Sequence, residues 1–299
     1  MQTVLKNQSC LPVHCVQVKK IKYIIIMSVT ITAADINKLR QSTGAGMLDC
    51  RKALTESNGD FESAIDWLRK QGQKVAAKRS DREAKEGVIF AKTNSNATVG
   101  MIVCVSCETD FVSKNADFVA FTERIADAAI ANNVNSAEEL NEVSVNGTKI
   151  SELINDKLAS IGEKIAIKFE RLEAEFVASY IHGANRMGVL VGMNKAVADA
   201  GRDVAMQIAA MNPLAVDEAS IAPETIARER DIAIEQIKAE GKPAEMAERI
   251  AVGKVTKFLK DNTLLAQPFV KDNGKSVADY LKSVDADLKV TEFKRVALG

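Results

Sequence analysis

The sequence has no excess of charge of either sign and few aromatic side chains. Its 299 residues include 40 lysines and arginines against 40 aspartates and glutamates, and aromatic residues make up 5%. A balanced chain has no overall field to attract nucleic acid or an anionic membrane. RNA recognition also relies on aromatic platforms for the bases. These absences argue against direct nucleic-acid and membrane binding.

Histidine and paired cysteines are scarce as well, which bears on catalysis and metal binding. The histidines are His14 and His182, and neither has an acid or nucleophile at a recognisable catalytic spacing. Cys104 and Cys107 have zinc-like spacing, but no second pair completes a tetrahedral site, and residues three apart in a strand face opposite sides. The five cysteines are odd in number, as expected for reduced thiols in a cytoplasmic protein. We expect a protein that is not an enzyme and has no cofactor and no metal.

The first 26 residues contain lysines but no acid and no arginine. Their apolar run, residues 23–26, is too short for a signal peptide or a membrane span. An acid-poor organellar presequence is the alternative, which the missing arginine disfavours. We expect Met27 to be the true start and residues 1–27 to be an upstream extension.

Residues 28–80 are predicted to form a docking domain of three short helices. Thr32 and Asp35 make a capping box that starts the first helix. Glycine-containing breaks at 43–46 and 58–59 separate the helices. The apolar residues that recur at helical spacing in the second helix are Met47, Cys50, Ala53 and Leu54. Mixed charges up to about residue 87 favour a solvated helical linker.

The apolar run Val99–Val105 predicts a buried strand, and Thr109–Val112 follows its exit. Turn-forming residues nearby place Phe111 on a loop, beside the carboxylate of Asp110. A large ring presented beside a charge is suited to probing a pocket on another protein. The alternative is a core aromatic that closes the edge of the sheet.

A faint internal repeat runs through the middle of the chain. Residues 99–103 match residues 187–191 in pattern, and an apolar helical stretch follows each. From Gly100 to Ala128 near the end of the first stretch is 28 positions, and from Gly188 to Ala209 in the second is 21. We assign the extra residues of the first copy to the loop that carries Phe111. The predicted fold class is α+β, with a duplicated core whose subdomains span residues 88–140 and 141–213.

The last third of the chain predicts a projecting element and a return to the core. Pro223 suits the start of a helix, and a break at 241–243 separates two charged helical stretches. We therefore expect residues 214–262 to form an inserted antiparallel helical hairpin. Residues 263–299 are expected to return to the core and end in a short carboxy-terminal module.

Several stretches resemble the bacterial elongation factor Ts family, in the expected order from about residue 28 to the end. Residues 39–54, which include Thr43-Gly44-Ala45-Gly46-Met47-Leu48, resemble its amino-terminal signature, and Cys107–Val112 resembles its second. The further similarities are Ile161-Gly162-Glu163, His182-Gly183 and Gln267-Pro268-Phe269-Val270.

The resemblance implies a guanine-nucleotide exchange factor that makes or breaks no covalent bond. Members bind elongation factor Tu in its GDP form and accelerate GDP release by disturbing its magnesium and phosphate site. The implied fold has a three-helix ubiquitin-associated-like domain, a two-part α+β core, an inserted hairpin and a short carboxy-terminal module. Elongation factor Tu is therefore the implied partner.

The resemblance also assigns residues to that partner. Phe111 matches a ring that wedges into the partner's G domain, Asp110 the acid beside it, and Thr109–Val112 the segment that dislodges magnesium. The residues that match the face gripping a G-domain helix are Arg40, Met47, Leu48 and Arg51. Ile161 and Gly162 match a core contact near the nucleotide site, and His182 matches a core position that faces the partner's third domain.

The rival function is an RNA-binding or ubiquitin-like-binding adaptor module, suggested by the small helical domain and the linker that follows it. The sequence pI of 6.8 disfavours RNA. Salt separates the two hypotheses, because an RNA binder loses affinity steeply as salt rises and an apolar wedge does not. The sequence leaves the oligomeric state open.

Overall fold

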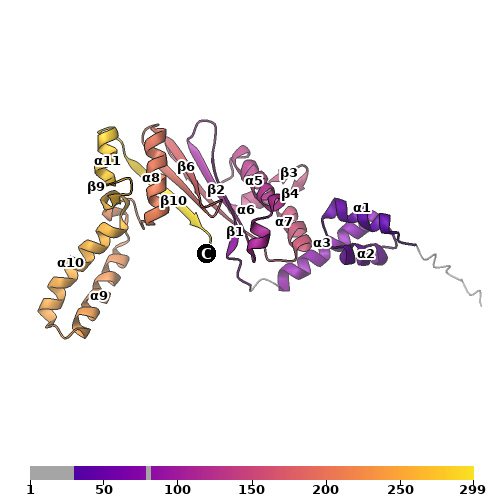
Figure 1. The fold of residues 1–299 in the computed structure, drawn as a ribbon, viewed down its shortest axis with the longest axis horizontal. Helices are drawn as coiled ribbons and strands as arrows, with labels where there is room; N and C mark the ends of the chain where they lie inside the picture. The colour runs from indigo at the N-terminus through magenta and orange to yellow at the C-terminus, as the bar shows by residue number, and fades with distance from the viewer. Residues whose placement is uncertain (1–29, 79–81) are drawn as a thin grey trace, which may run out of the picture.

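The computed structural model describes residues 30–78 and 82–299, so the predicted extension and start at Met27 lie outside the described residues. Figure 1 shows an elongated molecule, with a three-helix domain and a helical hairpin at opposite ends of its long axis. A mixed helix and sheet core lies between them, in agreement with the α+β class.

The three-helix domain consists of α1 (Ala33–Thr43), α2 (Met47–Glu56) and α3 (Phe61–Lys78). The Thr32 and Asp35 capping box is present, and Gly44 ends α1 with a φ of 69°, in the left-handed region that glycine adopts readily. The core residues of this domain are Leu39, Ala45, Cys50, Ala53, Leu54, Ala64 and Leu68. Met47, one of the residues matched to the partner-binding face, is exposed, because the buried stripe of α2 begins one turn later at Cys50.

The part of the predicted linker that lies in α3 is helical as expected, but it is not solvated, because α3 packs against α7 (Ile150–Ile161). A Cβ added to Gly72 would lie 2.8 Å from the Cβ of Ala159, so the two helices approach very closely there. Beside this contact, Arg69 approaches Glu152 at 3.9 Å and Asp156 at 3.6 Å. The three-helix domain is therefore docked on the core.

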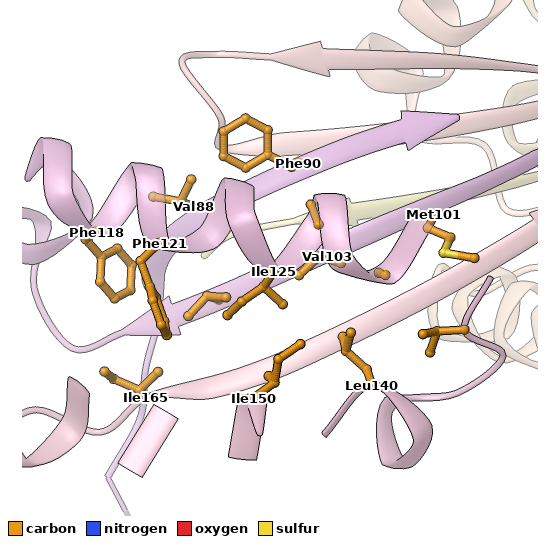
Figure 2. Close-up of a cluster of buried hydrophobic side chains, with 14 of the residues drawn as sticks. Val88, Phe90, Met101, Val103, Phe118, Phe121, Ile125, Leu140, Ile150 and Ile165 are labelled. Atoms are coloured by element: carbon orange, nitrogen blue, oxygen red, sulfur yellow. The ribbon is translucent and has the colours of Figure 1, made fainter. Parts of the chain in front are cut away.

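The first sheet has the antiparallel order β1-β2-β5, formed by β1 (Glu86–Thr93), β2 (Val99–Cys107) and β5 (Ala166–Glu173). Helices α5 (Ala116–Ala131), α6 (Ala137–Glu142) and α7 cover its outer face, beside the small hairpin β3 (Ser144–Val145) and β4 (Thr148–Lys149). Figure 2 shows the buried cluster under these helices, where Phe118, Phe121 and Ile125 of α5 approach the strands.

The predicted boundary after residue 140 falls inside this first layer. Strand β5 lies beyond it in the sequence, yet it pairs with β2 along its whole length, from Val99 opposite Glu173 to Ser106 opposite Ala166. The boundary was predicted from local sequence signals, but the pairing of β5 with a strand far away in the sequence determines the domain here.

The second sheet has the antiparallel order β10-β7-β6, formed by β6 (Phe176–His182), β7 (Met187–Met193) and β10 (Val290–Ala297). Its outer face packs against α8 (Ala198–Met211), α11 (Val277–Val284) and the segment with β8 (Pro268–Phe269) and β9 (Asp272–Ser276). The two matched apolar runs of the sequence lie in β2 and β7, which are the central strands of the two sheets.

The inner faces of the two sheets pack against each other. A buried cluster between them contains Ile89, Ala91, Ile102, Cys104, Leu172, Val177 and Leu190. A Cβ on Gly100 would lie 2.7 Å from Val177 Cγ1, and one on Gly188 would lie 2.8 Å from Ile89 Cγ2. These glycines occupy the matched positions of the internal repeat, and each allows the opposite sheet to approach. The core is therefore layered as helices, sheet, sheet and helices.

The predicted hairpin region contains α9 (Pro223–Ala239) and α10 (Ala244–Asn262), which pack against each other. Its buried contacts join Ala233 and Ile237 of α9 to Ala247 and Ala251 of α10. The short helices η1 (Glu218–Ser220) and η2 (Leu264–Ala266) flank it, and a bridge between Ala215 and Thr263 closes its base on the core. In the part of the chain that the structure describes, no helix is long and apolar enough to cross a bilayer.

We predict opposite effects for two glycine-to-alanine substitutions. Gly188→Ala places a methyl group against Ile89 and Ile102 between the sheets, and such overpacking lowers the free energy of unfolding by about 1–3 kcal/mol. Gly253→Ala, in α10 with open space around it, improves helix propensity and stabilises the helix by up to about 1 kcal/mol. Thermal unfolding followed by circular dichroism measures both. Equal midpoints for the two variants would show that the sheets are not in close contact at Gly188.

Candidate functional site

The exit of β2 carries the most exposed large apolar side chain of the described residues. Phe111 is 85% exposed, although the strand before it is buried throughout. The expected loop is in fact a four-residue helix, α4 (Asp110–Ser113). Val112 packs against the cluster under α5 and Ser113 is buried, so one side of α4 is anchored while Phe111 points away.

The residues flanking the ring are charged and paired with each other. Lys114 Nζ donates to Asp110 Oδ2 at 2.7 Å, one helical turn apart. The hydrogen bond from Lys114 lowers the pKa of Asp110 from its ordinary value, with the charge of Lys114 as a second cause. Asp110 is thus a carboxylate at neutral pH, partly exposed beside the exposed ring of Phe111.

The base of α4 is tied to a chain segment more than fifty residues away. The carboxylate of Glu163 accepts the N–H of Thr109 at 3.0 Å and its hydroxyl at 2.6 Å. Glu163 follows Ile161 and Gly162, where Gly162 ends α7 with a φ of 75°. The structure therefore brings Thr109–Val112 and the Ile161-Gly162 corner together.

His182 lies at the end of β6, and its Nδ1 lies 3.0 Å from the hydroxyl of Tyr180. The turn after it contacts β1, where Asn185 accepts the N–H of Ile89 at 2.8 Å and Arg186 pairs with Glu86 at 2.5 Å. Glu86 is opposite Cys107, the last residue of β2. His182 and α4 therefore lie at the same edge of the core.

The predicted residues of the three-helix domain form a second exposed patch. Met47 is 55% and Leu48 75% exposed at the start of α2, with Arg40 and Arg51 also exposed. The turn before them lies against the end of α7, since a Cβ on Gly44 would be 3.7 Å from the Cβ of Ser160. This patch is on a different domain from α4, but both lie near the end of α7.

The local sequence pattern identifies Phe111 and Asp110, but it gives no sign of the roles of Glu163 and Lys164. Both contact Glu108, because Glu108 donates its N–H to Glu163 at 3.0 Å and its carboxylate accepts the N–H of Lys164 at 2.7 Å. Glu163 belongs to the Ile161-Gly162-Glu163 motif, but the residues around it in the sequence do not indicate a hydrogen-bond partner near residue 109. Only the pairing of β2 with β5 brings the two segments together.

Comparison with known proteins places this architecture. A family model described as Elongation factor TS matches residues 108–299. The proteins named Elongation factor Ts from Flavobacterium psychrophilum and Christiangramia forsetii are 51% and 49% identical, each aligned over 90% of this chain and 99% of its own length. One from Clostridium perfringens is 40% identical, over 90% of this chain and 93% of its own. The chain belongs to the elongation factor Ts family.

Two cysteines of this elongation factor Ts family member, Cys104 and Cys107, are buried on opposite faces of the first sheet. Cys107 lies in the cluster under α5 and Cys104 in the cluster between the sheets. Burial raises the pKa of Cys104 to about 11 and that of Cys107 to about 12. Among the residues that the structure describes, no group of three or more metal-ligating side chains could hold an ion.

We predict that Cys104 and Cys107 resist alkylation in the native protein. Because the reactive species is the thiolate, iodoacetamide at pH 8 leaves both unmodified, whereas both react fully in guanidinium chloride. Peptide mass mapping measures the modification, and Val284→Cys, at an exposed position of α11, supplies the reactive control. Rapid native labelling of Cys107 would show that the exit of β2 is open.

Proposed function

We propose that this chain, a translation elongation factor that exchanges guanine nucleotide on elongation factor Tu, releases GDP by inserting Phe111 into its partner. The single observation that carries the mechanism is the exposure of this ring on an anchored four-residue helix. No covalent step is required. The adaptor alternative is not favoured, because the similar proteins are elongation factors Ts.

The physical basis is a coupling free energy between two ligands of the partner. Bound GDP lowers the affinity of the partner for this chain by some factor, and bound chain lowers the affinity of the partner for GDP by the same factor. Burial of a phenylalanine ring is worth about 1.5–3 kcal/mol. If the pocket of the partner that accepts Phe111 is open only when GDP is released, this free energy shifts the partner toward the open state.

We infer that Asp110 acts on the magnesium and phosphate site of the partner. Its carboxylate is ionised and lies beside Phe111. A carboxylate brought next to bound nucleotide repels phosphate and competes for the cation that phosphate holds. We assign Thr109–Val112 as the segment that disturbs this site.

The remaining predicted residues fit a second zone of contact. Met47 and Leu48 expose adjacent apolar side chains between Arg40 and Arg51, a composition suited to the apolar centre and charged rim of an interface. We assign this face to the G domain. We assign Ile161 and Gly162 to the contact near the nucleotide site, beside α4, and His182 to the partner's third domain.

We also propose that the chain has a ubiquitin-associated-like domain and a duplicated core. The helices α1 to α3 have the size and order of a ubiquitin-associated-like domain. The central strands β2 and β7 are each followed by a helix, and each carries a glycine toward the other sheet, as in a duplicated core. Eight residues, 108–115, separate β2 from α5, against four, 194–197, between β7 and α8, so this connection contains four of the seven extra positions that the sequence assigned to it. On this interpretation, α4 is an insertion in one copy. We place the protein in the cytoplasm, where translation takes place.

We predict that Phe111→Ala lowers the maximal rate of stimulated GDP release by more than about tenfold, the scale of a central interface anchor. Stopped-flow fluorescence with a fluorescent GDP analogue on elongation factor Tu measures this rate. Val284→Ala removes an exposed apolar side chain of α11 and serves as the matched control. Release at the unaltered rate with Phe111→Ala would sink the assignment of the ring.

We predict a different kinetic effect for Leu48→Ala. A contact made equally before and after GDP leaves contributes affinity without accelerating release. The variant therefore needs about fivefold more factor for half-maximal release, an effect near 1 kcal/mol, while the maximal rate stays the same. A titration of factor concentration in the stopped-flow assay separates these quantities. A reduced maximal rate would place Leu48 in the exchange step itself.

A further inference from the structure

Helix α4 cannot hold its own position. Four residues form barely one turn, and so short a helix is unstable without tertiary contacts. Thr109 stands at the N-cap, where a threonine hydroxyl ordinarily accepts an N–H of the first turn. Here the hydroxyl instead donates to Glu163 at 2.6 Å. The Thr109 side chain therefore does not cap α4 and instead bonds to a residue from another part of the fold.

The contact with Glu163 is dense and specific. One carboxylate oxygen, Oε2, accepts the N–H groups of Glu108 and Thr109, both at 3.0 Å, and Oε1 accepts the Thr109 hydroxyl. Two successive backbone groups at the entrance of α4 are thereby directed at one side chain. This arrangement fixes the direction in which the chain leaves β2.

A reciprocal contact closes the arrangement. The carboxylate of Glu108 accepts the N–H of Lys164 at 2.7 Å and a guanidinium N–H of Arg82 at 2.9 Å. Lys164 in turn donates from its Nζ to the carbonyl of Arg82 at 2.9 Å. Each of the two segments, 108–109 and 163–164, thus supplies a side chain to the backbone of the other. The chain that arrives from the three-helix domain is tied to the same place.

We propose that Glu163 is a positioning residue for nucleotide exchange, which sets the orientation of α4 and thereby of Phe111. This inference rests on the proposed function of Phe111 and adds to it the group that holds the ring. Glu163 acts through Thr109 and Glu108 and needs no contact with the partner. A ring on an untethered turn samples many orientations, and ordering it on binding consumes part of the free energy that would drive release.

The conservative variant has a defined expectation. In Glu163→Gln the amide oxygen can take the place of Oε2 and accept both N–H groups, while the amide nitrogen donates to the Thr109 hydroxyl, which can act as an acceptor. Glu163→Ala removes all three bonds. The matched control is Glu139→Ala, because Glu139 also accepts a backbone N–H, that of Asn135 at 2.8 Å, in the same layer but away from α4.

The test measures stimulated GDP release from elongation factor Tu by the full chain, in the stopped-flow assay. We expect Glu163→Ala to lower the maximal rate by about tenfold, with Glu163→Gln and Glu139→Ala within about threefold of the unaltered protein. Amide hydrogen exchange of residues 108–113 should accelerate in Glu163→Ala alone, and thermal unfolding checks that the fold is retained. An unaltered maximal rate for Glu163→Ala, or equal losses for Glu163→Ala and Glu139→Ala, would overturn the proposal.

A double variant separates positioning from general damage. If Glu163 acts only through the ring, adding Glu163→Ala to Phe111→Ala causes no further loss of rate, so the two effects are strongly non-additive. Fully additive losses would contradict the inference. If Phe111→Ala itself releases GDP at the normal rate, the proposed function of the ring fails. If Phe111→Ala is slow and Glu163→Ala is normal, only the present inference fails.

Discussion

The close contact between two three-stranded sheets supports the rest of this structure. A sheet of three strands has two faces to cover, and each sheet here uses the other for one face and helices for the second. Gly100 and Gly188 make the contact possible, because a Cβ at either position would overlap a side chain of the opposite sheet. The resulting core carries the helical domain at one end and the hairpin at the other (Figure 1).

The same packing assembles the edge at which α4 lies. Because β1 contacts both β2 and the turn after β6, the exit of β2 and His182 come to one side of the core. Because β5 pairs with β2, the corner after α7 reaches the base of α4. Docking of α3 on α7 adds the exposed start of α2. Segments from three parts of the chain are therefore held on one body, and under the proposed function this limits the ordering cost of binding the partner.

Much of the fold was predictable from short-range patterns. The capping box at Thr32, the strand from Val99 and the hairpin break near 241–243 depend on neighbours within a few residues, and all three are present. The errors arose where distant contacts override such patterns. Helix α3 packs against α7 where a solvated helical linker was expected, and the division at residue 140 cuts through the layer that β5 completes.

The sequence by itself determined the family, the order of the elements and the presence of Phe111 beside Asp110, because these depend on motifs and on local periodicity. Only the tertiary structure decided that the ring is exposed, that its segment is a helix, and that Glu163 accepts the hydroxyl of Thr109 at the start of that helix. Glu163 lies 54 residues from Thr109. No local pattern encodes that pairing, which exists because two strands from separate parts of the chain bury their faces in the same sheet.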